Sequence, residues 1–249
     1  MYSDTKKLNE NLKYLKLNCI LDTYQKTAKL AAKNNKLDPI EFLAEVIANQ
    51  AQERQQRASE RRLRMAKLPV MKTLEHYLFT HPRKINQPAV SHLFRLEFIK
   101  EKENVLFIGT TGLGKTHLAI ALAYQACQNG YSVFFTKAAD MVTALQNAQK
   151  GGNFILTMKK YLKVQLLIID ELGYVSFDRY GANLLFQVIS NRYETGSTIL
   201  TGNRAFKQWP LTFDNDNTIT SAILDRLLHH AHIITIEGDS YRMKEKTLL

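Results

Sequence analysis

The residues from Gly109 to Thr116 read GTTGLGKT and follow the pattern G-x-x-x-x-G-K-[ST] in full. The glycines of this run let successive backbone N–H groups turn toward one anion, in conformations that a Cβ would obstruct. Lys115 would reach the β- and γ-phosphates of a nucleotide, and Thr116 would offer its hydroxyl to Mg²⁺. A glycine-rich turn followed by a chance Lys-Thr pair is the alternative. The residues expected to bind the nucleotide are Gly109, Thr110, Thr111, Gly112, Leu113, Gly114, Lys115, Thr116 and His117.

Two adjacent carboxylates, Asp170 and Glu171, follow an apolar run that begins at Leu166. Asp170 would complete the Mg²⁺ shell opposite Thr116, and Glu171 would polarise a water molecule for in-line attack on the γ-phosphate. Two incidental surface acids are the alternative. Together with the glycine loop, the pair predicts that the chain binds ATP with Mg²⁺ and hydrolyses it.

Three further polar residues are candidates for contacts with the γ-phosphate. Asn203 follows the apolar run 198–201 and would hydrogen-bond the phosphate or the attacking water, although an Asn after a strand is usually a turn residue. Arg226 and Arg242 are candidates for an arginine that stabilises the transition state, from the same subunit or a neighbour. A surface or salt-bridge arginine is the more ordinary interpretation of each.

Histidines and cysteines give weaker indications. His229, His230 and His232 are close in sequence, but no other ligand grouping accompanies them, so ordinary polar or packing histidines are favoured over a metal site. Cys19 and Cys127 are far apart in helix-like contexts, which favours reduced, buried thiols over a disulfide or a zinc site.

Alternating apolar runs and helical stretches must position these side chains. The apolar runs cover residues 105–108, 132–136, 166–170, 198–201 and 232–236, with helix-like segments between them. Short apolar strands separated by helices are typical of a parallel sheet that is covered on both faces. The expected fold class is therefore α/β, with a parallel five-stranded sheet flanked by helices.

The first hundred residues differ from this core in composition. They contain 19 Lys and Arg against 10 Asp and Glu, whereas residues 101–249 contain 15 against 13. Asp38 and Pro39 carry an N-cap and a first-turn proline, so a long helix is expected from there toward Ala66. A basic helical segment beside a nucleotide site favours nucleic acid as partner, with solvated basic helices as the alternative. The DNA-binding candidates are Arg54, Arg57, Arg61, Arg62, Arg64 and Lys67.

These patterns divide the chain into three expected parts. Residues 1–68 form a basic helical N-terminal domain, residues 69–100 a proline-containing connector that docks onto the core, and residues 101–249 the nucleotide-binding domain. No run approaches the roughly 18 apolar residues of a membrane span, and the N-terminus has no secretory signal, so a cytoplasmic location without membrane contact is expected.

Taken together, these motifs resemble those of the IstB-like transposition helper ATPases, relatives of the DnaC-type helicase loaders in the AAA+ class. The matching segments are residues 109–116, 166–173, 177–186, 198–204 and 224–241. The resemblance implies a P-loop AAA+ core, with Asn203 as sensor 1, Arg226 as an arginine finger acting in trans and Arg242 in a sensor-2-like position. One departure is Ala205, where the family often has a proline after its Asn-Arg pair.

The resemblance also implies what the protein acts with. Subunits would self-associate in an ATP-dependent manner on double-stranded DNA and present it to a partner transposase in target selection. A DnaC-type loader of a replicative helicase is one alternative, in which single strands matter more. A small-molecule P-loop kinase is another, although the adjacent carboxylates favour water as acceptor and the basic segment has no role in that scheme.

Overall fold

The computed structural model describes residues 2–34, 38–81 and 84–241. The chain forms two compact units, residues 1–61 and residues 62–249. The division into three parts at residues 68 and 100 stays a prediction.

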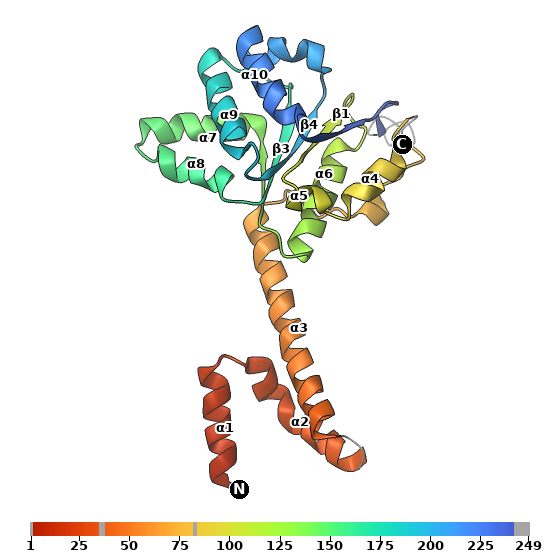
Figure 1. Ribbon diagram of the computed structural model, residues 1–249, viewed down its shortest axis with the longest axis vertical. Helices are drawn as coiled ribbons and strands as arrows, with labels where there is room; N and C mark the ends of the chain where they lie inside the picture. Colours follow the sequence, from red (N-terminus) through yellow and green to blue (C-terminus); the bar gives the residue numbers. More distant parts are fainter. Residues whose placement is uncertain (1, 35–37, 82–83, 242–249) are drawn as a thin grey trace, which may run out of the picture. The chain divides into compact units, whose positions relative to one another are not determined.

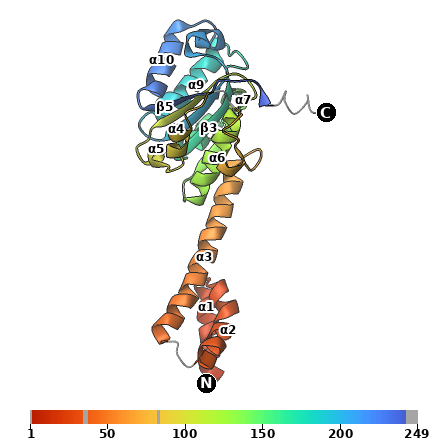
Figure 2. The same cartoon turned by 90° about the vertical axis from the view of Figure 1, so that its right-hand side faces the viewer.

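The N-terminal unit is helical (Figures 1 and 2). It contains α1 (Tyr2–Tyr14), α2 (Asn18–Asn34) and the greater part of α3 (Pro39–Ala66). As predicted, α3 begins at the proline and extends to residue 66. A small core of Leu12, Ile20 and Val46 holds the three helices together.

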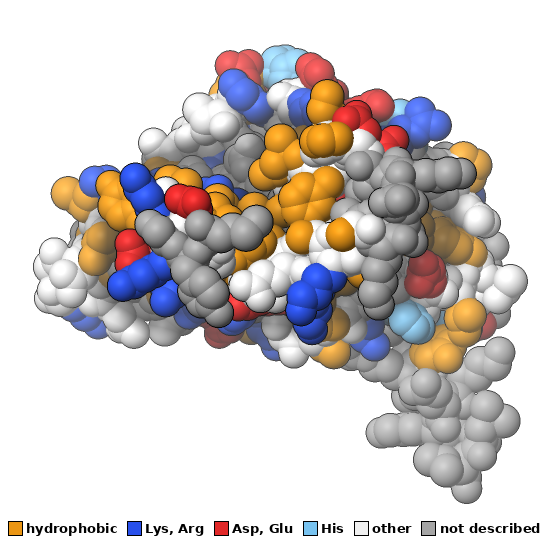
Figure 3. Space-filling model, turned by 90° about the horizontal axis from the view of Figure 1, so that it is seen from below, with side chains coloured by type: hydrophobic (Ala, Val, Ile, Leu, Met, Phe, Trp, Pro, Cys, Tyr) orange, Lys and Arg blue, Asp and Glu red, His pale blue; other side chains and the backbone are white. Residues whose placement is uncertain are grey.

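This small core leaves apolar surface exposed in the same unit. Leu8, Leu30 and Leu43 are among its exposed large side chains. In the space-filling view from below, hydrophobic side chains lie among charged ones (Figure 3).

In the described part of the chain, the second unit contains a five-stranded parallel sheet with strand order β2-β3-β4-β1-β5. This confirms the predicted fold class. The strands β1, β3 and β4 occupy the centre and are buried along almost their whole length, which is why they read as continuous apolar runs. The strand bounds are β1 Asn104–Ile108, β2 Val133–Lys137, β3 Leu166–Leu172, β4 Ser197–Gly202 and β5 Ala231–Thr235.

Helices cover both faces of this sheet (Figures 1 and 2). Successive residues of a strand point to opposite faces, so Phe107 and Ile168 pack with α6 while Leu106 and Ile169 pack with α7, α9 and α10. The helices on the α6 side are η1 (Leu74–His76), α4 (Gln87–Leu93), α5 (Glu97–Lys100) and α6 (Lys115–Gln128). Those on the other side are α7 (Ala138–Lys150), α8 (Phe154–Leu162), α9 (Arg179–Arg192), η2 (Phe206–Thr212) and α10 (Asn217–Leu228).

Residues 69–100 pack against the α6 side of the core. Tyr77, Leu93 and Phe98 from this stretch are buried in the same cluster as the residues of α6 and β1. The segment therefore contributes core side chains as well as connecting the N-terminal helices to β1. Among the described residues, no helix is long and apolar enough to cross a membrane.

A buried arginine joins several segments at the amino ends of β3 and β4. Arg192 is 2% exposed and donates to the carbonyls of Tyr161 at 2.8 Å, Val164 at 2.9 Å and Ser197 at 2.6 Å. It also donates to the Gln165 carbonyl and the Thr198 hydroxyl. Burial lowers the pKa of its guanidinium to about 10, so it remains charged at neutral pH.

Candidate nucleotide site

A cavity of about 720 Å³ lies at the carboxyl end of the sheet, where the glycine loop follows β1. This is within the usual range for small-molecule sites, about 300–1,000 Å³. One part is lined by the loop and by the ends of β3 and β4, and the other by the segment before β1. The lining residues are Val70, Met71, Lys72, His76, Tyr77, Leu78, His81, Gly112, Leu113, Gly114, Lys115, Thr116, His117, Ile120, Glu171, Tyr174, Thr201 and Tyr241.

The loop has the backbone that an anion cradle requires. Gly112 and Gly114 have φ of +83° and +82°, in the left-handed region that side chains rarely adopt. A Cβ on Gly114 would lie 2.6 Å from Cε2 of Tyr77, and one on Gly112 would lie 2.1 Å from Oγ of Ser240. The helix α6 begins directly afterwards at Lys115, so its unpaired N–H groups and positive dipole end face the loop. The cradle therefore fits a polyphosphate.

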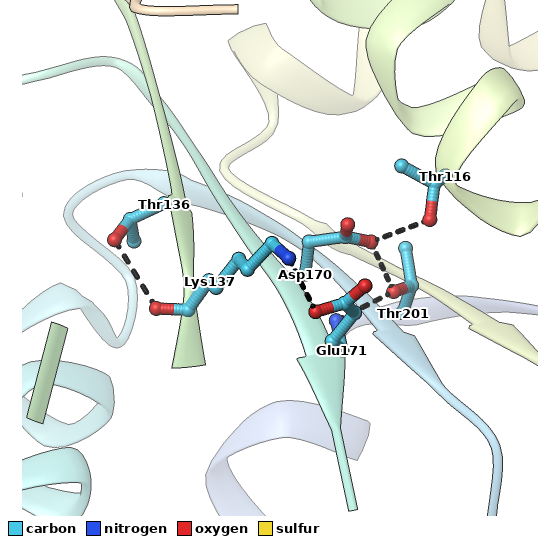
Figure 4. A network of polar contacts seen from close by, with 6 residues as sticks. All are labelled: Thr116, Thr136, Lys137, Asp170, Glu171 and Thr201. Carbon is cyan, nitrogen blue, oxygen red and sulfur yellow. Dashed lines mark hydrogen bonds and ion pairs between the residues drawn. The ribbon is translucent and has the colours of Figure 1, made fainter. Parts of the chain in front are cut away.

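Lys115, Thr116 and Asp170 meet beside this loop (Figure 4 shows the last two). Lys115 is 5% exposed, and its ammonium donates to the Thr110 carbonyl at 2.6 Å. The Thr116 hydroxyl donates to Oδ1 of Asp170 at 2.9 Å. Hydroxyl and carboxylate oxygens are ligands that Mg²⁺ accepts, so the pair fits a magnesium ion bound together with phosphates.

Thr201, at the end of β4, joins the two carboxylate residues. Its hydroxyl donates to Oδ1 of Asp170 at 2.5 Å and accepts from the backbone N–H of Glu171 at 3.0 Å. The pairing of β3 with β4 shifts register between Ile169 and Leu172, and Glu171 has φ of +63°. Such a bulge re-aims side chains at the end of a strand. Here Asp170 is directed toward α6, while Glu171 lines the cavity.

The Asp170 carboxyl is 2% exposed, and this burial raises its pKa. Hydrogen bonds from Thr201 and Thr116 act in the opposite direction, and Lys137 also lowers the pKa while Glu171 raises it. The two hydroxyls therefore compensate part of the cost of keeping a carboxylate charged in the interior.

Lys137, the last residue of β2, forms an ion pair with Glu171 (Figure 4). The Lys137 ammonium lies 2.9 Å from Oε2 of Glu171, and both side chains are partly exposed. The hydrogen bond to Glu171 raises the pKa of Lys137. The register of β2 on β3 pairs Lys137 with Asp170, which explains how the lysine reaches the carboxylates.

Asn203 lies just beyond β4, next to the turn that follows β3. Its Oδ1 atom is buried and has no hydrogen-bond partner among the described residues. A Cβ on Gly173 would lie 2.8 Å from that atom, so only glycine fits there. A buried amide oxygen without a partner is rare in folded proteins and is suited to accepting a hydrogen bond from a ligand or water.

Aromatic side chains line the part of the cavity away from the carboxylates. The Tyr77 hydroxyl donates to the Leu113 carbonyl at 3.2 Å, and its ring packs edge-on against His117. Burial raises the pKa of Tyr77 to about 12. Burial also lowers the pKa of His117, whose Nε2 donates to the Thr73 carbonyl at 2.9 Å. Tyr174 also lines the cavity, and its hydroxyl lies 3.1 Å from that of Thr111 in the glycine loop.

Two arginines named in the sequence analysis are not placed in the cavity. The Arg226 guanidinium donates to the Ser190 hydroxyl at 3.2 Å and to the Ala222 carbonyl at 3.0 Å, and it stacks over the Phe186 ring. Arg226 therefore belongs to the contact between α9 and α10, away from the cavity lining. Arg242 lies outside the described residues.

The basic residues of α3 and Lys67, which directly follows it, fall into two groups. Arg62 is half-buried, and its Nε donates to the Cys127 carbonyl at 2.8 Å. The others are exposed, and Arg57 forms an ion pair with Glu53. The exposed residues are Arg54, Arg57, Arg61, Arg64 and Lys67.

Three site residues were missed by the sequence analysis. Lys137 and Thr201 end strands that flank β3, but this is visible only once the strand order is known. Tyr77 lies well before the loop that it contacts. Each is an ordinary residue in its own local sequence, and only the fold brings it to the site.

Relatives of the chain are found in bacterial insertion sequences. The ATP-binding protein of insertion sequence IS5376 from Geobacillus stearothermophilus is 36% identical over 242 residues, which is 97% of this chain and 96% of that protein. The ATP-binding protein of insertion sequence IS21 from Pseudomonas aeruginosa is 39% identical over 215 residues, which is 86% of this chain and 81% of that protein.

Solved structures with the same fold include two replication proteins. DnaA from Aquifex aeolicus bound to AMPPCP has a TM-score of 0.58 at 22% identity, covering 72% of this chain and 54% of that chain. The DnaC helicase loader has a TM-score of 0.54 at 21% identity, covering 66% of this chain and 96% of that chain. At this identity the likeness concerns the fold alone, which is that of P-loop AAA+ proteins.

The sequence profile of the IstB-like ATP binding protein family matches residues 10–248, almost the whole length of the chain. The glycine cradle, the Thr116–Asp170 pair and the parallel sheet agree with that match. The chain belongs to the IstB-like ATP binding protein family.

Proposed function

We propose that this protein is a Mg²⁺-dependent ATPase that assembles on double-stranded DNA and assists a transposase in selecting or preparing its target. The observation that carries the ATPase part is the network Thr116–Asp170–Thr201–Glu171 beside the glycine loop. The insertion-sequence origin of the relatives supports the transposition context.

Each residue of the loop and network has a proposed role toward ATP. The loop N–H groups bind the phosphates. The Lys115 ammonium, which donates to the Thr110 carbonyl in this structure, donates to the phosphate oxygens instead when ATP binds. Thr116 and Asp170 hold Mg²⁺. When bound, the ion neutralises charge on the phosphate oxygens. His117 and the aromatic end of the cavity contact the rest of the nucleotide.

Glu171 orients and deprotonates the attacking water. Glu171 lines the cavity together with Thr201, Lys115 and loop residues. Asn203 assists, because its unpaired buried Oδ1 accepts a hydrogen bond from that water. Lys137 holds the Glu171 carboxylate by an ion pair and so restrains it before ATP is in place.

Arg226 completes the site of a neighbouring copy of the chain. Among the described residues that line the cavity there is no arginine, and Arg226 is held against Ser190 and Phe186 on its own chain. An arginine presented from the next subunit would contribute to transition-state stabilisation only in the assembled protein. Arg242 remains proposed as a second nucleotide contact.

A comparison of Glu171→Gln with Lys115→Ala tests the proposed roles of Glu171 as the base and of Lys115 as a phosphate ligand. Glu171→Gln is expected to bind ATP normally and lose at least about 10²-fold in kcat, because the amide cannot accept the proton. Lys115→Ala is expected to lose nucleotide binding itself. A Glu171→Gln protein that turns over at the unmodified rate would contradict the assignment of the base.

Mixing variants tests whether Arg226 acts in trans. Arg226→Ala retains an intact cavity, whereas Lys115→Ala retains a normal arginine, so mixed assemblies contain some complete sites. Activity in the mixture above that of either variant alone is expected. Arg179→Ala, on the exposed surface of α9, is the matched control and should need no rescue. A mixture that stays inactive argues against a shared site.

Salt dependence tests the DNA part of the proposal. The exposed residues Arg54, Arg57, Arg61, Arg64 and Lys67 are proposed to contact phosphates, so log K for a long duplex should fall linearly with log salt, with a slope of about −0.9 per phosphate neutralised. Replacing Arg54 and Arg61 by Gln should reduce the slope by about 2. Lys159→Gln with Lys163→Gln removes the same charge near α8 and is the control. A salt-independent affinity would contradict the proposal, and a preference for single strands would favour a helicase loader.

A further inference from the structure

The ends of α9 and α10 bring Glu194, His229 and His230 together on the surface. One ligand atom from each residue, a carboxylate oxygen and a nitrogen from each ring, all lie within 4.8 Å of one another. All three residues are exposed. They were not grouped by the sequence, because Glu194 follows α9 whereas the two histidines follow α10.

This cluster is remote from the nucleotide cavity. The His230 carbonyl accepts from the N–H of Asn104, the first residue of β1, and Ala231 begins β5. The cluster is therefore at the amino end of the parallel sheet, whereas the glycine loop follows the carboxyl end of β1. None of its residues lines the cavity.

The backbone at the cluster favours a cation. Both α9 and α10 end here, and the carbonyl ends of helices carry partial negative charge. His229 caps α10 by donating its N–H to the Asp225 carbonyl. Glu194 has φ of +58°, and this turn places its side chain beside the histidines. All three residues thus lie in turns that directly follow the two helices.

Tyr193 gives one of the rings a fixed orientation. Its hydroxyl lies 2.7 Å from Nδ1 of His229. The other ring nitrogen, Nε2, is therefore the one through which this ring could bind a ligand. A hydrogen bond on the second ring nitrogen is the usual arrangement for a histidine that binds a metal. The ring of His230 lies beside it, with the ring centroids 4.0 Å apart.

We infer that Glu194, His229 and His230 form a binding site for a divalent transition-metal ion, with Zn²⁺ as the best match. Two imidazoles and one carboxylate are a donor set that zinc accepts, and they leave a fourth position open. Imidazole ligands favour zinc over Mg²⁺, so this site is distinct in chemistry from the Thr116–Asp170 pair. Bond lengths of about 2.0–2.1 Å require the three ligand atoms to move closer together, and their exposed side chains have room to do so.

The third histidine of the sequence cluster does not belong to the site. His232 is on β5, and its Nε2 lies 2.8 Å from Oε2 of Glu103, with which it forms a separate pair. Its replacement is therefore not expected to affect the metal.

Calorimetric titration of the full-length, nucleotide-free protein with ZnCl₂ in Mg²⁺-free buffer tests the inference. One equivalent of zinc per chain is expected, and Co²⁺ as a spectroscopic substitute should show visible absorption from bound metal. His230→Ala and Glu194→Gln should each weaken binding by about 10–100-fold, and Tyr193→Phe by about tenfold. His92→Ala, an exposed histidine beside Glu97, is the matched control and should bind zinc like the unmodified protein.

Two readouts keep the test independent of folding and of the ATPase. Glu194 and His230 are exposed, and Tyr193→Phe keeps the partly buried ring and removes only its hydroxyl, so circular dichroism and ATP affinity should be unchanged in each variant. Zinc should also raise the unfolding temperature of the unmodified protein and not that of His230→Ala. Absence of saturable binding, or binding that survives both His230→Ala and Glu194→Gln, would overturn the inference. Neither result would affect the proposal for the ATP site.

Discussion

Replacing Thr201 by Val tests how the two carboxylate residues are held. The side chain is 1% exposed, and Val has nearly the same shape, so the change removes a hydroxyl without opening a cavity. That hydroxyl donates to Oδ1 of Asp170 and accepts from the N–H of Glu171. The change therefore removes one hydrogen bond to each residue without touching either carboxylate.

The expected cost follows from these two bonds. A hydrogen bond to a charged group contributes about 1.5–3 kcal/mol, and leaving a buried N–H unpaired costs about 1–3 kcal/mol. Because Glu171 is only partly buried, we expect a total loss of about 2–4 kcal/mol in the free energy of unfolding. Loss of the Thr201 bond also raises the pKa of Asp170 further. Well below the ordinary pKa of an Asp carboxyl, about 3.9, Asp170 is protonated in both the folded and the unfolded state, so the loss should be smaller there than at pH 7.

Urea unfolding followed by fluorescence provides the measurement. Trp209 is the single tryptophan of the chain and is buried in the same unit as Thr201, so its emission reports on that unit. With a slope of about 2–3 kcal/mol/M, the midpoint should fall by about 1 M. Thr201→Ser keeps the hydroxyl and should lose less, while Thr235→Val, on an exposed position of β5, should stay within about 0.5 kcal/mol. A Thr201→Val midpoint equal to that of the unmodified protein would refute the reasoning, as would a Thr201→Ser midpoint as low as that of Thr201→Val.

Three further perturbations have defined outcomes. Arg192→Met should lower the free energy of unfolding by about 3–5 kcal/mol because five oxygen atoms, three of them in buried hydrogen bonds, lose their donor, whereas the exposed Arg179→Met should have almost no effect in the same urea assay. Lys137→Met should raise kcat by no more than about fivefold, since its partly exposed pair with Glu171 contributes at most about 1 kcal/mol; a steady-state rate below that of the unmodified protein would show that Lys137 instead positions the base. Burial raises the pKa of Cys127 to about 11, and the side chain is inaccessible to solvent, so iodoacetamide at pH 8 should label its peptide at least about 100-fold more slowly in native than in urea-unfolded protein, as followed by mass spectrometry.

The N-terminal helices show how far local pattern reasoning extends. The start of α3 was predicted from an N-cap and a first-turn proline, which are adjacent in sequence and act locally. By contrast, Arg62 was grouped with its basic neighbours, and only the structure shows that it donates to the Cys127 carbonyl.

The same contrast holds at the nucleotide site. The glycine loop and the Asp170–Glu171 pair were recognisable in advance because their function depends on consecutive residues at the end of a strand. The strand order was not readable from the apolar runs, since each run is compatible with several positions in a sheet. For that reason Lys137, Thr201 and Tyr77 were found only in the folded structure.

The sequence by itself determined the parallel α/β class, the phosphate loop and the family, because these depend on periodicity and on short contiguous motifs. Tertiary structure alone decided which strand ends flank Asp170, which aromatic side chains line the cavity, and that Glu194 meets His229 and His230. The physical reason is the same in each case. These contacts join residues that are distant along the chain, and their proximity results from the packing of whole helices and strands rather than from any local preference of the residues themselves.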